Sequence, residues 1–265
     1  MNITAMCFSP NGNTKKIVCT IAKSIDENFK VIDFTLPKFR EYEYRFSSED
    51  LIVIGVPVYA GRVPNVLLKF LDKIKGENAL CVPVVVYGNR NYDDALIELK
   101  TILENNGFCA IAGGAFIAQH AFSRILAKNR PDSEDLAKVI DFGKQIFDKL
   151  NTSHEFKTVK VNGFTPIREY YKPRDRAGNF INILKVKPKT KLELCNNCGI
   201  CVNACPMGSI SEENPSEIVG ICIKCCACEK KCPTGAKYFD DEGYLYHKTE
   251  LELEYTRRAE PEIFI

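Results

Sequence analysis

Thirteen cysteines occur in this 265-residue chain, and nine of them fall between residues 195 and 232. Eight of the nine follow one spacing, C-x2-C-x2-C-x3-C-P, which occurs twice with an interval of 27 residues. The two copies are Cys195, Cys198, Cys201 and Cys205, then Cys222, Cys225, Cys228 and Cys232. Thiolate sulfur is a soft ligand that suits zinc and iron–sulfur clusters. The spacing therefore predicts metal centres built from cysteine thiolates.

Three closely spaced cysteines can wrap one tight loop, which brings three sulfur atoms and several backbone N–H groups onto one face of a cluster. The proline after the fourth cysteine turns the chain away, so this thiolate lies beyond the reach of the loop. The run resembles that of bacterial two-cluster ferredoxins, in which the fourth cysteine binds the other cluster. The resemblance implies two [4Fe–4S] clusters. Their ligands would be Cys195, Cys198, Cys201 and Cys232 for one, and Cys222, Cys225, Cys228 and Cys205 for the other.

Zinc and disulfide bonds are the alternatives for these cysteines. Zinc sites use separated C-x2-C pairs, not three evenly stepped cysteines that end in C-P. Disulfide scaffolds are typical of small secreted proteins, whereas residues 1–8 have the pattern of a strand and not of a leader peptide. The pattern therefore favours clusters over both alternatives. Cys226 interrupts the repeat without a ligand role, and we expect it to be a small packed residue.

The first 150 residues alternate between short apolar runs and amphipathic helical segments. Strands are predicted at 2–8, 29–34, 51–56, 81–87 and 108–117, and helices over 17–25, 66–74, 95–103 and from Asp132 to Leu150. Alternation of this kind predicts an α/β fold whose parallel sheet is covered on both faces. Five strands in about 150 residues suit a doubly wound sheet in the order 2-1-3-4-5.

Three loops follow predicted strands at the carboxyl edge, where such sheets bind ligands. The first opens directly into a helix, and its hydroxyls, glycine and free N–H groups suit a phosphate group. It lacks the lysine of a Walker motif, which disfavours a nucleoside triphosphate. The candidate residues are Ser9, Asn11, Gly12, Asn13 and Thr14; then Pro57, Val58, Tyr59, Ala60 and Gly61; then Gly88, Asn89, Arg90, Asn91 and Tyr92.

These loops resemble those of flavodoxin. The phosphate loop of that family reads S/T-x-T/N-G-x-T, which Ser9, Asn11, Gly12 and Thr14 match. The resemblance covers about the first 150 residues and implies FMN as the cofactor. In flavodoxins the two later loops enclose the flavin ring, often between aromatic side chains. The resemblance therefore places Tyr59 and Tyr92 against the ring, with backbone groups of residues 57–61 and 88–91 at its polar edge.

One feature departs from the flavodoxin pattern. Flavodoxins usually surround the flavin with acidic residues, whereas Arg62 and Arg90 stand in the ring loops here. A cation near the ring would stabilise the anionic reduced flavin and raise its potential. The sequence thus suggests a flavin that accepts electrons from the clusters. Gln119, His120 and Ser123 follow the fifth predicted strand, and we assign them no role.

The motifs divide the chain into a flavodoxin-like domain over 1–151 and a small α+β ferredoxin domain over 190–245, with a linker over 152–189 and a tail over 246–265. Between Lys157 and Lys191 there are ten Lys or Arg and two acids. Such a segment could dock an acidic partner or nucleic acid. Since it lacks a helical or stacked-aromatic pattern, a solvated linker without nucleic acid is favoured.

The whole chain resembles the flavodoxin/ferredoxin fusion proteins of anaerobes. The resemblance implies an electron-transfer protein that relays electrons between two [4Fe–4S] clusters, FMN and unidentified redox partner proteins, in an oligomeric state that the sequence leaves open. A flavin-dependent reductase fed by its own clusters, and an iron–sulfur protein without flavin, are the alternatives. We expect an anaerobic cytoplasm and no membrane span, because the apolar run at 51–60 is too short.

Overall fold

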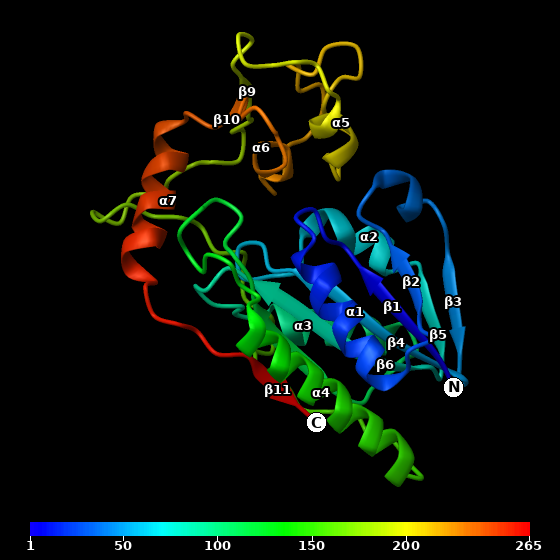
Figure 1. Cartoon of the computed structure of the whole chain (residues 1–265). Helices are drawn as coiled ribbons and strands as arrows, with labels where there is room; N and C mark the ends of the chain where they lie inside the picture. Colours follow the sequence, from blue (N-terminus) through cyan, green and yellow to red (C-terminus); the bar gives the residue numbers. More distant parts are fainter.

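The computed structural model describes residues 1–265, and its N-terminal part is a doubly wound α/β fold (Figure 1). Five parallel strands lie side by side in the order β2-β1-β4-β6-β8. They are β1 (Asn2–Cys7), β2 (Lys30–Asp33), β4 (Asp50–Pro57), β6 (Leu80–Tyr87) and β8 (Gly113–Ile117), with the short β7 (Cys109–Ala110) beside the start of β6. Counted along the chain, this order confirms the predicted 2-1-3-4-5 arrangement.

Helices cover both faces of the sheet, and a separate core fills each interface. α1 (Asn13–Ile25) and α4 (Ser133–Thr152) enclose 20 buried residues on one face. The short α2 (Leu68–Leu71) and α3 (Ala95–Asn105) enclose 25 on the other. Successive strand residues alternate between the two cores, as the strand period of two requires. α4 begins where the sequence predicts, because Asp132 and Asp135 form a reciprocal capping box.

The helix predicted over 66–74 is much shorter than expected. A 3-10 turn over Asn65–Leu67 and the four residues of α2 end the helical stretch at Leu71. The chain then forms β5 (Ile74–Glu77), which pairs in parallel with β3 (Tyr44–Ser47). The apolar side chains do face one core. Their spacing therefore predicted correctly which side of this segment is buried. It did not predict that the helix ends at Leu71 and that a strand follows.

The ferredoxin region contains little regular structure. β9 (Lys189–Thr190) pairs with β10 (Lys237–Tyr238). Each copy of the cysteine motif contains one short helix, α5 (Ile200–Ala204) in the first and α6 (Ala227–Lys230) in the second. Its buried apolar clusters hold only four and three residues. The region lies over the N-terminal domain at the end from which the loops after β1 and β8 emerge (Figure 1).

The predicted tail forms a helix and a strand. α7 (Glu242–Glu254) runs beside the ferredoxin region, and the chain then returns to the N-terminal domain (Figure 1). There β11 (Glu262–Phe264) pairs antiparallel with β8 as a sixth strand at the edge of the sheet. The last residues thus tie the two parts of the molecule together. None of the helices combines the length and the apolar character that a bilayer span requires.

Candidate functional site

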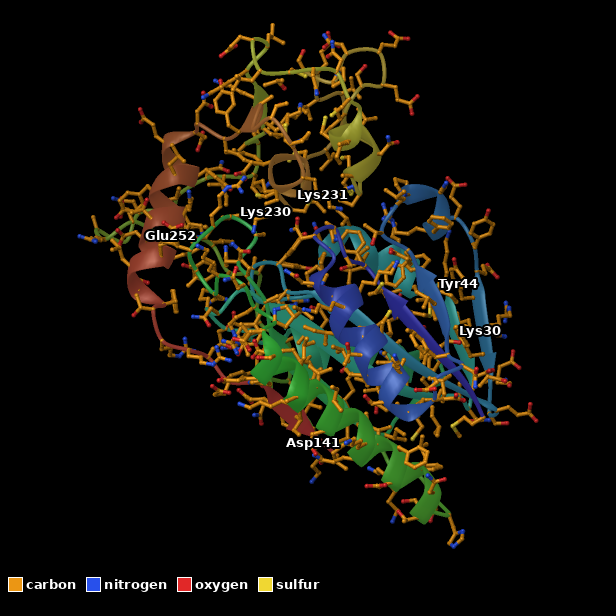
Figure 2. All side chains as sticks on the ribbon, viewed as in Figure 1. Lys30, Tyr44, Asp141, Lys230, Lys231 and Glu252 are labelled. Carbon is orange, nitrogen blue, oxygen red and sulfur yellow. The ribbon has the colours of Figure 1, made fainter.

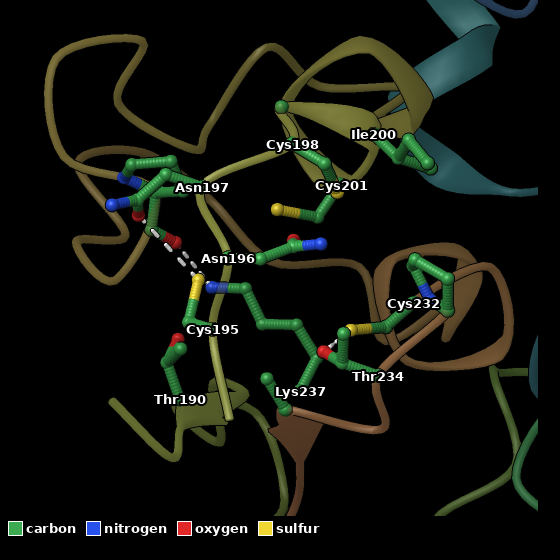
Figure 3. Close-up of a pocket in the computed structure, with 14 residues that line it drawn as sticks. Thr190, Cys195, Asn196, Asn197, Cys198, Ile200, Cys201, Cys232, Thr234 and Lys237 are labelled. Atoms are coloured by element: carbon green, nitrogen blue, oxygen red, sulfur yellow. Dashed lines mark hydrogen bonds between the residues drawn. The ribbon is translucent and has the colours of Figure 1, made fainter. Parts of the chain in front are cut away.

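The eight repeat cysteines stand around two cavities. Cys195, Cys198, Cys201 and Cys232 line the first (Figure 3). Cys205, Cys222, Cys225 and Cys228 line the second. Each cavity thus has three cysteines from one copy and the fourth from the other, the same division that the ferredoxin resemblance implies. The thiols surround a space and do not converge on a point as ligands of a single ion do.

The two copies share a backbone conformation as well as a spacing. Three pairs of equivalent residues have left-handed φ angles: Asn197 and Lys224 (both 54°), Gly199 and Cys226 (70° and 58°), Gly208 and Gly235 (58° and 69°). These turns direct N–H groups towards sulfur. The Lys224 N–H donates to Cys222 Sγ at 3.4 Å, and the Ser209 N–H donates to Cys205 Sγ at 3.3 Å. Bonds of this kind orient thiolates and tune iron–sulfur clusters.

Burial makes several of these thiols harder to ionise. It raises the pKa of Cys201 and Cys222, and it raises the pKa of Cys225 to about 12. The pKa of Cys232 is lowered instead, because the Thr234 hydroxyl and nearby backbone N–H groups outweigh its slight burial. A coordinating metal deprotonates a thiol outright. The buried set is therefore suited to metal-bound thiolates and not to free ones.

Cys226 is a packed residue, in agreement with the expectation. Its side chain is 1% exposed and lies in a small cluster with Phe239 and Tyr244. Its Sγ lies 3.3 Å from the Tyr244 hydroxyl and donates to the Lys224 carbonyl. Burial raises the pKa of this thiol well above its usual range. Cys226 therefore stays neutral and fixes α7 to the ferredoxin region.

The loop after β1 has the features of a phosphate site. Gly12 has a φ of 86° with open space on its side-chain side, and as the N-cap residue of α1 it supplies no side-chain acceptor. The Ser9 hydroxyl accepts the Lys15 N–H of the first turn at 2.9 Å. The buried Oδ1 of Asn11 has no hydrogen-bond partner. A helix N-terminus with N–H groups left over and an orphaned acceptor fit the phosphate and a hydroxyl group of FMN.

The second cysteine set touches this loop. Asn11 Nδ2 donates to the Cys225 carbonyl at 2.8 Å, and Arg40 donates to the Pro206 carbonyl at 2.6 Å. Tyr59, on the loop after β4, lies in the same interface. Burial of its phenol raises the pKa of Tyr59 well above its usual range, and the nearby Cys225 thiol acts in the same direction. The loops after β1 and β4 are thus direct neighbours of the second cavity.

Lys230 makes a second contact between the two parts. Its ammonium donates to the carbonyls of His120 and Ser123 at 2.6 and 3.2 Å, and it lies on the side of the ferredoxin region that faces the N-terminal domain (Figure 2). Burial and then Lys230 lower the pKa of His120 to about 3. The imidazole is therefore neutral at physiological pH, and its Nδ1 accepts the Phe122 N–H. Gln119 Nε2 donates to the Ser123 carbonyl.

Asn89 binds the returning C-terminal segment. Its amide donates to the carbonyls of Tyr255 and Arg257 at 2.8 and 2.7 Å, and its Oδ1 accepts the Ala259 N–H at 3.3 Å. The side chain is 3% exposed. The amide of Asn89 is therefore committed to holding the segment that leads to β11.

Tyr92 has a structural place that corrects its expected role as a stacking platform. The ring is 4% exposed, belongs to the core and packs against Tyr87 with centroids 5.6 Å apart. Its hydroxyl donates to the Glu262 carboxylate at 2.6 Å. The loop turns this side chain inward, where β11 fixes it. Of the two tyrosines predicted to face the flavin, only Tyr59 lies at the interface with the cysteines.

Both arginines of the ring loops are neutralised, which corrects the inference of a cationic flavin site. Arg62 forms a two-point contact with the Glu98 carboxylate at 2.7 and 2.6 Å. Arg90 forms an ion pair with the Asp93 carboxylate of its own loop. A paired guanidinium contributes little net potential to its surroundings. No unpaired cation of these loops is therefore available to raise a flavin potential.

The predicted linker packs on the ring loops. The Tyr171 N–H donates to the Ala60 carbonyl at 2.8 Å, and the Tyr170 hydroxyl donates to the Val63 carbonyl at the same distance. Further along, Arg168 binds the buried Asp94 at 2.7 and 2.8 Å. One basic side chain of the segment, Arg168, thus pairs with a carboxylate of the N-terminal domain. A purely solvated linker is thus incorrect for this part.

The other predicted flavin contacts lie along the same edge. Thr14 is buried in the first turn of α1, and Pro57 and Val58 are half-buried at the end of β4. Gly61 has a φ of 76° and lies so close to Asp93 that a side chain would collide with it. The remaining three are Asn13 at the start of α1, Gly88 packed against His120, and the exposed Asn91.

Two segments of the chain match the models of known protein families. Residues 6–89 match the family model of a flavodoxin domain, and residues 188–211 match that of a 4Fe–4S binding domain. A 140-residue stretch is 29% identical to an uncharacterized protein of Methanocaldococcus jannaschii, and covers 51% of this chain and 89% of that protein.

Three solved structures were compared with the N-terminal part. A flavodoxin from the domain Archaea is 19% identical, with 57% of this chain and 99% of that chain covered and a TM-score of 0.41. Flavodoxin 2 from Bacillus cereus is 18% identical (56% and 99% covered, TM-score 0.39). A Fusobacterium nucleatum flavodoxin bound to flavin mononucleotide is 14% identical (56% and 98% covered, TM-score 0.39). The two family matches show a flavodoxin domain in the N-terminal part and a 4Fe–4S binding domain in the C-terminal part, a combination consistent with a flavodoxin/ferredoxin fusion that supports a role in electron transfer.

Proposed function

We propose that the protein relays electrons between FMN in the flavodoxin domain and two [4Fe–4S] clusters in the ferredoxin domain. The observation that carries this proposal is the 2.8 Å hydrogen bond from Asn11 to the Cys225 carbonyl. It joins the candidate phosphate loop directly to a cysteine of the second cavity. A flavin held by this loop and a cluster held by Cys225 would belong to one continuous site.

The side chains that would hold these groups fall into three sets. The first and second cysteine sets would each bind one cluster, and the first turn of α1 with Ser9 and Asn11 would bind the FMN phosphate. When bound, each cluster would exchange one electron and the flavin two, so two clusters can serve one flavin. Tyr59 would fill the space between the ring and the second cysteine set.

The tether and the docking contacts have a kinetic purpose in this proposal. Both carriers lie in one chain, so their effective concentration does not depend on diffusion. The ferredoxin domain contacts the phosphate loop at Asn11 and the neighbouring segment at Arg40. Cys198, at the first cavity, is exposed. Redox partner proteins would therefore exchange electrons at the first cluster, in the reducing, anaerobic cytoplasm that an exposed cluster ligand needs.

An iron–sulfur protein without flavin is the second candidate, and two observations favour it. The Asn89 amide is bound to the C-terminal segment, and the Tyr92 ring lies in the core. The Tyr92 side chain, which was expected at the flavin ring, thus has another partner, and the Asn89 side chain is not free to contact a flavin. In this case the flavodoxin domain would serve as a docking scaffold for the clusters.

Anaerobic purification with iron, sulfide and flavin quantified on one sample tests both candidates. The relay requires about eight iron atoms and one FMN per chain. Eight iron atoms, without flavin and without uptake of added FMN, would establish the scaffold. About four iron atoms would show that only one cysteine set binds a cluster.

A pair of variants then locates the flavin. Gly12→Asp places a carboxylate at the phosphate position, and Gly12→Asn places a neutral side chain of the same shape there; both residues tolerate the positive φ. We expect the aspartate variant to lose FMN, through charge repulsion, and the asparagine variant to keep more of it. Iron content should be unchanged in both. Equal FMN binding by the two variants would place the flavin phosphate elsewhere.

A further inference from the structure

The two cysteine copies differ in where they carry a lysine. At the third position, Asn197 in the first copy corresponds to Lys224 in the second. At the position five residues after the last cysteine, Ile210 in the first copy corresponds to Lys237 in the second. The backbone conformations of the copies are alike. The two lysines are therefore differences of charge on a common framework.

Lys237 belongs to the first cavity. It is 3% exposed and lines this cavity, and its side chain crosses between Cys195 and Cys232 in the close-up (Figure 3). The ammonium donates to the Pro215 carbonyl and pairs with no carboxylate. A buried cation without a counterion is costly. An anionic cluster in this cavity would supply the missing counterion.

The equivalent place in the second cavity is apolar. Ile210 lines this cavity and is 5% exposed, and it packs with Cys201 and Cys228. The second cavity therefore has no lysine in the position of Lys237.

Lys224 stands beside the second cavity instead. Its N–H donates to Cys222 Sγ at 3.4 Å, and its ammonium donates to the Cys222 carbonyl at 3.2 Å and the Leu184 carbonyl at 3.3 Å. In the first copy the equivalent Asn197 has no charge, and its Oδ1 accepts from Cys195 Sγ. Lys187 also acts on Cys222, but it is exposed, so water and salt screen its charge.

We infer that each cluster has its own neighbouring cation, Lys237 for the first and Lys224 for the second, and that these lysines raise the two reduction potentials separately. The inference rests on the proposed function, because it requires two clusters. Thiolate-bound clusters are anions that gain a negative charge when reduced, and a nearby cation favours the reduced form. Lys237 is the more deeply buried, so its effect is the larger. The first cluster then receives the stronger stabilisation of its reduced form.

The test makes the two cysteine copies alike at one of these two positions at a time. Lys237→Ile and Lys224→Asn each introduce the residue of the other copy, and Lys185→Asn removes an exposed charge of the linker as a control. Redox titration of the anaerobic holoprotein, followed by electron paramagnetic resonance, should resolve two one-electron waves. We expect each variant to lower a different wave. For Lys237→Ile the equilibrium should change at least tenfold, which is 59 mV for one electron. Lys185→Asn should move neither.

Two outcomes would overturn the inference while leaving the relay intact: both waves unchanged in both variants, or the same wave moved equally by both. Lys237→Gln retains a donor for the Pro215 carbonyl without the charge, and it serves if Lys237→Ile does not load with iron. Failure of both variants to bind the first cluster would show that Lys237 acts in assembly and not on the potential. A wild-type protein with fewer than two waves would instead contradict the proposed function.

Discussion

The two domains differ in what holds them together. The flavodoxin domain has two cores of 25 and 20 buried residues, one on each face of its sheet. The ferredoxin domain has clusters of four and three. Apolar burial is the main favourable term in folding, and domains without enough of it depend on metals or disulfides. The first domain can thus fold by burial, whereas the second needs its metal centres.

Removal of iron should separate the two domains most strongly. A chelator under anaerobic conditions, or the Cys198→Ala variant for the first cluster, should unfold much of the ferredoxin domain, because ligation supplies its folding free energy. The flavodoxin sheet should stay folded. Hydrogen exchange read by mass spectrometry distinguishes the domains: protection should vanish over 190–240 and persist in β4. Full protection of 190–240 without iron would show that the small clusters suffice.

A core substitution in the flavodoxin domain should destabilise that domain and leave the clusters of the ferredoxin domain unchanged. Ile54→Ala removes a fully buried side chain of β4 and should cost about 2–5 kcal/mol. Urea unfolding followed by far-ultraviolet circular dichroism measures this cost, and the cluster absorption of the folded variant should match wild type. Ile140→Ala, on the exposed side of α4, is the control and should cost far less. Equal costs for the two would contradict the core assignment.

The C-terminal segment that joins the domains should respond more weakly. Asn89→Gly keeps the left-handed backbone but removes the buried amide, and it leaves the carbonyls of Tyr255 and Arg257 without this donor. We expect a loss of about 1–3 kcal/mol. Hydrogen exchange should show the loss at 255–264 before the rest of the sheet. Asn91→Ala, an exposed position in the same loop, serves as the control. An unaffected C-terminal segment would mean that β11 alone holds it.

Local patterns made the sheet order and the cysteine sets predictable. Alternating strands and helices, and a spacing repeated after 27 residues, are visible within short windows of sequence. Contacts between residues that lie far apart in the sequence were not predictable. β11 has only three residues, too few to show a period. Arg62 and Glu98 are 36 residues apart, and only the packing of α3 brings them together. The inward turn of Tyr92 likewise depends on β11, which supplies Glu262.

The ion pair between the linker and the flavodoxin domain should give the smallest effect. Asp94 is 1% exposed, and the Arg168 guanidinium with two backbone N–H groups lowers its pKa to about 2. A carboxyl whose folded pKa lies below its unfolded value of about 3.9 stabilises the protein above that value. This contribution is lost as the pH falls from about 4 towards 2. It is small because Arg168 is half-exposed, and water weakens the pair.

Arg168→Met tests this pair directly. Without the guanidinium, the pKa of Asp94 should rise towards its usual value, and the Phe164 N–H, which Asp94 also accepts, should exchange faster at acid pH. Carbon-13 titration of the Asp94 carboxyl measures the shift. Arg174→Met removes an arginine of the same segment that binds only a carbonyl and the Phe180 ring, and should leave Asp94 unchanged. If Asp94 titrates alike in both variants, the linker is held to the flavodoxin domain by the tyrosine contacts at Ala60 and Val63 and not by charge.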